Sequence, residues 1–225
     1  MANLLILSPA TIAAIAASRG SGDQNLLTPD PKEVWADNAV NTAANIDIDL
    51  GTVQPVDTVF LGHVIPPAAG ATWTITGGAA SYTTTVLKAS SALRAVDAAG
   101  QSPLLSHGFW TGASANIRFL RLAVTQPAGS PTLTAGVVLA GQAFRPTYNH
   151  EWGSGRAVLD TGSKTPLPSG GFSTVEQARK ASWSWTLGDL TDAEVDALHA
   201  IALDRGETRP VLVVEDPAAT TGQLR

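Results

Sequence analysis

Polar and apolar residues alternate in short runs over most of the first 145 residues. Residues 45–51 alternate strictly, and residues 71–76 place three threonines on one face and Trp73 and Ile75 on the other. Successive side chains of a β-strand point to opposite faces, so this period of two predicts half-buried strands. Further strands are expected over residues 56–64, 82–87, 117–125 and 133–144.

These runs recur at short intervals without a helical period between them, which is typical of a sandwich or a jelly roll. The 225 residues are enough for one large domain or two small ones. We therefore expect a mostly-β protein with a jelly-roll β-sandwich over residues 23–146. A short N-terminal helical arm would occupy residues 1–22, and a C-terminal strand–helix–strand segment residues 147–225.

The N-terminal segment is strongly apolar between residues 3 and 17. Its first basic residue, Arg19, follows the apolar run, whereas an export signal places positive charge before it. The run is also shorter than the ~20 residues that cross a bilayer, so we expect no membrane insertion. Ser8 as cap, Pro9 at the first helical position and Gly20 as terminator predict a helix over residues 9–18.

The C-terminal segment contains the clearest helix signal. Thr191 and Glu194 form a capping box, apolar residues follow at helical spacing, and Gly206 ends the pattern, which predicts a helix over about residues 190–205. Strands are expected on either side of it, over residues 181–187 and 209–217. Residues 162–171 are rich in Pro, Gly and Ser and predict an exposed loop, which would serve with the N-terminal helix for docking.

The charge balance limits the classes of partner. The net charge is −5, and the 14 Lys and Arg residues are scattered singly, whereas nucleic-acid binding requires a clustered basic face. Charged residues make up only 15% of the chain, well below the ~25% of an average globular protein. We therefore expect no nucleic-acid partner and a surface that other proteins cover in part.

A search for catalytic groups finds no complete set. The chain has no cysteine, and its four histidines, His63, His107, His150 and His199, lack metal-binding spacing. Asp47 and Asp49 lie two residues apart, which allows a glycosidase pair but favours a polar outer strand face. Asp23, Asp30 and Asp57 offer oxygens to a calcium ion, although turn formation is their default role. We expect no enzyme activity, no cofactor and no metal.

The six tryptophans are unusual beside so few other aromatic residues. Trp73 and Trp183 lie in alternating runs and are expected in the core. Trp110 and Trp152 lie in segments that resemble loops, where buried anchoring of the loop is the default role. Exposed tryptophan also anchors protein interfaces and stacks on sugar rings. The candidate interface or glycan contacts are Trp110, Trp152, His107 and Phe109.

Residues 25–144 resemble a discoidin-like jelly roll of the galactose-binding type. The motifs that carry the resemblance are NLL at 25–27, DPKEVW at 30–35, IDIDLG at 46–51, VDTV at 56–59 and IRFLRL at 117–122. The resemblance implies the fold more than a ligand, because this sandwich serves lectins, adhesion modules and structural parts.

The remaining part of the chain resembles the closing segment of tail proteins from long-tailed bacteriophages and prophages. The matching motifs are WSWT at 183–186, LTDAE at 190–194, GETRP at 206–210 and VLVVEDP at 211–217. This resemblance implies a structural virion protein at the tail tip or baseplate, assembled in the bacterial cytoplasm with other phage tail proteins as a homo-oligomeric ring. The alternative is a carbohydrate-binding module that recognises host surface glycans.

Overall fold

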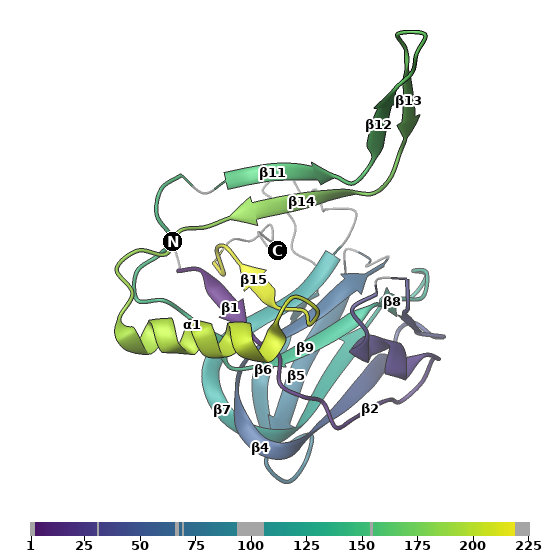
Figure 1. Cartoon of the computed structure of the whole chain (residues 1–225). Helices are drawn as coiled ribbons and strands as arrows, with labels where there is room; N and C mark the ends of the chain where they lie inside the picture. The colour runs from purple at the N-terminus through teal and green to yellow at the C-terminus, as the bar shows by residue number, and fades with distance from the viewer. Residues whose placement is uncertain are drawn as a thin grey trace.

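The computed structural model describes residues 3–30, 32–65, 68, 70–93, 106–153 and 155–218. It consists of a curved body of β-strands, one α-helix at its side and a hairpin that projects from it (Figure 1). The mostly-β class and the jelly-roll sandwich predicted from the sequence are confirmed.

Two unusually long strands, β4 (Ala43–Val64) and β7 (Ser106–Thr125), run antiparallel through the whole body. Their pairing shifts register at three points, between Asp49 and Gln54, between Val56 and Thr58, and between Leu61 and Val64. Such irregularities bend a strand and increase its twist. Each strand therefore contributes one half to each layer of the sandwich.

The first layer has the order β2-β4-β7-β5-β6 and includes β2 (Ala14–Ala17), β5 (Thr72–Gly78) and β6 (Thr85–Ala92). In the second layer, the later half of β4 lies between β7 and β9 (Val137–Gly141). The main core fills the space between the layers and takes Ile46 and Ile48 from one half of β4 and Val59 and Leu61 from the other. Trp73 is fully buried there, as predicted.

A small lid of β3 (Trp35–Ala36), β8 (Thr134–Ala135) and the 3-10 helix η1 (Asp23–Leu27) closes one end of the sandwich. Trp35 is fully buried beneath it, and its indole N–H donates to the carbonyl oxygen of Arg19 at 3.1 Å. Gly20 has φ +87 at this point, and a side chain there would collide with the Ala36 carbonyl. The close approach explains why glycine occupies this position.

The predicted helix over residues 9–18 is wrong. The N-terminal segment instead forms β1 (Leu5–Leu7) and β2, and Ile15 of β2 is buried opposite Ile48. Ser8-Pro9 is only a local signal for a helix start, whereas the β-branched residues that follow favour strands. Pairing with the open edge of β4 gives the backbone N–H and C=O groups of β2 hydrogen-bond partners and also buries Ile15. These long-range contacts override the local preference for a helix.

A second, smaller sheet has the order β10-β1-β15, with β10 at Ala143–Phe144 and β15 at Leu212–Val214. The predicted C-terminal strand thus pairs with the N-terminal strand. Helix α1 (Asp192–Arg205) begins at the predicted capping box and ends at Gly206. The predicted apolar stripe of α1, Val195, Leu198, Ile201 and Ala202, is not fully buried at any position, and Val195 is 49% exposed.

The projecting hairpin, called the arm below, consists of two paired segments. Its base pairs β11 (Gly155–Asp160) with β14 (Arg179–Ser184), and its outer part pairs β12 (Ser163–Pro166) with β13 (Phe172–Val175) (Figure 1). The segment predicted as a loop over residues 162–171 is exposed but largely forms this outer hairpin. Trp183, predicted in the core, is only half-buried on the arm.

Candidate functional site

An apolar pocket lies where the second layer of the sandwich meets the small sheet β10-β1-β15, called the C-terminal sheet below. Side chains alternate along β4 and β7, so Phe60, His107 and Phe109 point away from the main core and toward this junction. The pocket has a volume of about 230 Å³. Its lining consists of Pro29, Phe60, His63, His107, Val137, Leu139, Pro210, Val211 and Leu212.

His63 and His107 are the polar side chains of this pocket. The backbone N–H of His63 donates to Nδ1 of His107 at 3.2 Å, and the two rings lie 5.7 Å apart. Burial, with a smaller contribution from His63, lowers the pKa of His107 to about 4. Burial also lowers the pKa of His63. Both rings are therefore neutral at pH 7.

Among the described residues that line the pocket there is no carboxylate. His63 is held in a left-handed backbone conformation, with φ 53. Gly136 makes room for it, because a Cβ at that position would lie 3.0 Å from the Cβ of His63. The pocket is thus built to present a neutral, mostly apolar surface.

The four contacts predicted from the sequence do not form one site. His107 and Phe109 belong to the pocket and to the adjacent core. Trp110 lies in β7 and not in a loop; it is half-buried, packs against the main core and covers Gly112. Trp152 is fully exposed at the base of the arm. Trp152 is the one member of this set that stands free in solvent.

A polar face on the outside of the first layer, called the Asp–Arg face below, carries two ion pairs. Arg121 holds Asp47 through two hydrogen bonds of 2.6 Å, and Arg118 holds Asp49 through two of 2.9 Å. The hydrogen bonds from Arg118 lower the pKa of Asp49. The prediction that Asp47 and Asp49 form a polar outer face is confirmed, and both carboxylates are engaged by arginine.

Two aromatic rings complete the Asp–Arg face. Tyr82 and Phe119 lie 5.1 Å apart, edge to face. The guanidinium group of Arg118 lies 4.7 Å from the centre of the Phe119 ring, and that of Arg121 lies 5.4 Å from the centre of the Tyr82 ring. All six side chains are partly accessible, so the face offers rings, hydrogen-bond donors and acceptors together.

The aspartates considered for calcium are engaged elsewhere. Asp57 is buried and accepts hydrogen bonds from Arg145 at 2.7 Å and from the backbone N–H of Ala143 at 3.0 Å. Asp23 and Asp30 accept hydrogen bonds from nearby backbone N–H groups in turns. Within the residues that the structure describes, no group of three or more candidate ligands is placed to hold a metal ion.

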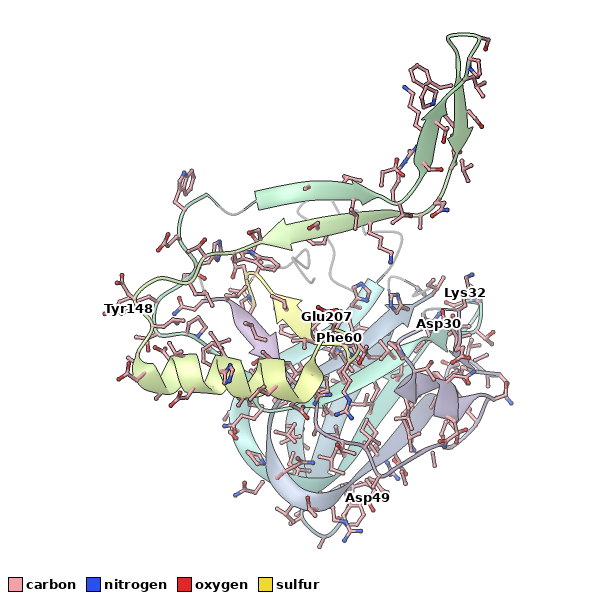
Figure 2. All side chains as sticks on the ribbon, viewed as in Figure 1. Asp30, Lys32, Asp49, Phe60, Tyr148 and Glu207 are labelled. Atoms are coloured by element: carbon pink, nitrogen blue, oxygen red, sulfur yellow. The ribbon has the colours of Figure 1, made fainter. Side chains whose placement is uncertain are left out.

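The arm carries exposed apolar side chains on both faces. Val158 and Leu159 are neighbours in β11 and therefore point to opposite faces, and they are 70% and 57% exposed. Phe172 near the tip is 57% exposed, with the Lys164 ammonium 4.0 Å from its ring centre. Figure 2 shows that the side chains of the outer hairpin, β12 and β13, stand clear of the body.

Comparison with known proteins finds no match to a family model and none to a curated protein sequence. The structures that resemble the chain include "CBM32 of AlyQ in complex with 4,5-unsaturated mannuronic acid", with 15% identity, a TM-score of 0.43 and coverage of 60% of this chain and 98% of that one. Another is "CpGH89CBM32-6 produced by Clostridium perfringens", with 11% identity, a TM-score of 0.40 and coverage of 57% of this chain and 92% of that one. A pectin-binding carbohydrate-binding module has 13% identity, a TM-score of 0.40 and coverage of 59% of this chain and 92% of that one.

These likenesses are too distant to assign a ligand or a function to this chain. Among the described residues, no helix has the length and apolar character needed to cross a membrane. The function must therefore be argued from the three surfaces described above: the arm, the apolar pocket and the Asp–Arg face.

Proposed function

We propose that this chain is a structural protein that assembles with other protein chains through its arm. The observation that carries the proposal is the exposure of Val158 and Leu159 on opposite faces of one two-stranded ribbon. An isolated two-stranded hairpin is at best marginally stable in water. A ribbon with apolar side chains on both faces therefore needs partner surfaces that cover it.

The energy available from covering the arm is substantial. Full burial of a large apolar side chain contributes ~1.5–3 kcal/mol, and Val158, Leu159 and Phe172 are 70%, 57% and 57% exposed. Covering what is still exposed therefore offers about 3–5.5 kcal/mol before the entropic cost of association. Both outer edges of the base, along β11 and β14, are also unpaired with any described strand. Such edges add backbone hydrogen bonds when a partner strand lies against them.

The assembly that we propose is the tail of a long-tailed bacteriophage, at its tip or baseplate. The tail-like motifs at residues 183–217 and the low proportion of charged residues support this choice. The test is immunogold electron microscopy of phage particles with an antibody to this chain. Label confined to one end of the tail is the expected result; unlabelled intact and partly disassembled particles would exclude the virion role.

A second candidate function, carbohydrate binding, is favoured by the Asp–Arg face. Sugar rings stack on aromatic side chains, and their hydroxyl groups pair with the remaining donors and acceptors of arginine and aspartate. The rings of Tyr82 and Phe119 lie directly beside both ion pairs. This proposal depends on these side chains alone.

A glycan array tests the second candidate with a matched pair of variants. Tyr82→Ala removes a ring of the Asp–Arg face, whereas Tyr148→Ala removes a tyrosine that is 63% exposed beside α1, away from that face (Figure 2). We expect the first variant to lose glycan binding and the second to retain it. Binding that is unchanged in Tyr82→Ala but lost in Trp152→Ala would move the site to the base of the arm.

A further inference from the structure

The tip of the arm presents an aromatic group that its own chain leaves uncovered. Phe172 is 57% exposed, and the Lys164 ammonium lies over its ring. The arm projects away from the body (Figure 1), and no arm residue lines the apolar pocket of its own chain. Whatever covers Phe172 must therefore come from another molecule.

The apolar pocket has the size and chemistry to receive a phenyl ring. An apolar cavity of ~150 Å³ is known to accept benzene, and this pocket has about 230 Å³. The lining residues that the structure describes carry no charged side chain, and both histidines are neutral at pH 7 because burial lowers their pKa values. Phe60 and His107, whose rings lie 5.2 Å apart, would offer aromatic contacts to an entering ring.

The charge distribution favours a second copy of this chain as the partner. Residues 155–184 contain four basic and two acidic residues, a net charge of +2, while the whole chain carries −5, so the remainder carries −7. The arm of one copy is thus attracted to the body of another. At the rim of the pocket, the exposed residue Pro29 is followed by exposed Asp30, which suits the ammonium group of Lys164.

We propose that the arm of one copy inserts Phe172 into the apolar pocket of a second copy, with Lys164 near Asp30 beside the pocket. The donor and acceptor surfaces are different, so the contact is head-to-tail, and repetition of it produces a closed ring or an open filament. This inference deepens the assembly function proposed above and rests on it, since it names the partner and the surface that the arm would contact.

The absence of cysteine from the chain allows a direct test by disulfide crosslinking. Gly171→Cys and Val211→Cys place one thiol beside Phe172 at the tip of the arm and one in the pocket lining, so the phenyl ring itself is kept. The two full-length variants are mixed under mild oxidation over a series of protein concentrations and examined by non-reducing electrophoresis. As a matched control, Val195→Cys places the thiol on the exposed face of α1, away from the pocket.

We expect a covalent dimer from Gly171→Cys with Val211→Cys, at least tenfold more abundant than from Gly171→Cys with Val195→Cys. Equal yields, or no dimer up to the limit of solubility, would overturn the proposal. Circular dichroism of each variant verifies that the fold is intact; if Val211→Cys is misfolded, Leu139→Cys takes its place in the pocket. Tail labelling by immunogold without this crosslink would leave the assembly function standing and assign the arm to a different partner.

Discussion

Acidification is expected to weaken the junction between the sandwich and the C-terminal sheet, because a protonated, positively charged His107 is unfavourable in the apolar pocket. The pKa of His107 is lowered from 6.5 to about 4 by burial. The unfolded chain therefore binds a proton more readily than the folded chain between these two pH values. Stability from this group is fully present above pH 6.5 and is lost as the pH falls toward 4.

The magnitude follows from the size of the shift. A pKa that falls from 6.5 to about 4 corresponds to ~3 kcal/mol of unfolding free energy at pH 4 and below. At pH 5 the same two pKa values give a loss of ~2 kcal/mol relative to pH 7. The lowered pKa of His63 acts in the same direction.

The assay is urea denaturation at pH 7 and pH 5, comparing the intact protein with His107→Asn. The Asn side-chain oxygen can still accept the hydrogen bond from the His63 backbone, but the variant has no titrating group at this position. The carboxylates titrate equally in both proteins, so their contributions cancel in the comparison. We expect the intact protein to lose ~2 kcal/mol more than the variant; equal losses would refute the assignment of a buried, neutral His107.

Three further changes probe other parts of the fold, each measured as a shift in unfolding free energy. Asp57→Ala leaves Arg145, whose side chain is 37% exposed, without its buried partner and should cost ~1.5–3 kcal/mol; a cost below ~1 kcal/mol would show that the pair is dispensable. Thr191→Ala removes the cap of α1 and should cost ~1 kcal/mol, whereas Thr191→Ser should restore it. Gly20→Ala should destabilise by more than ~1 kcal/mol because of the positive φ and the collision with Ala36, and a neutral effect would contradict the close approach.

The sequence predicted correctly those parts of the fold that depend on interactions between residues close together in the chain. Alternation over residues 45–51 placed Ile46 and Ile48 inside and Asp47 outside, as the structure has them. The capping box at Thr191 placed the start of α1 correctly because both of its hydrogen bonds lie within four residues. In these cases the residues that decide the structure are neighbours in the chain.

Contacts between distant residues explain what the sequence could not predict. Two separate strands were predicted over residues 45–51 and 56–64, yet both belong to β4. Pro55 lies between two register shifts and outside the stretches of β4 that pair with β2 and β9, where a missing N–H is tolerated. His63 and His107 are 44 residues apart and meet because β4 pairs with β7. The available signal was weak: His107 and Phe109 alternate with Gly108 and Trp110, which indicates that the first two share a face.

The role of the arm in assembly is tested most directly by sedimentation velocity of the intact protein and two variants. The arm variant carries Val158→Ser, Leu159→Ser and Phe172→Ser, and the control carries Val195→Ser and Leu203→Ser, which remove apolar side chains of comparable exposure from α1. We predict multimers for the intact protein and the control, and single chains of 23.2 kDa for the arm variant. Identical sedimentation of all three proteins would contradict assembly through the arm.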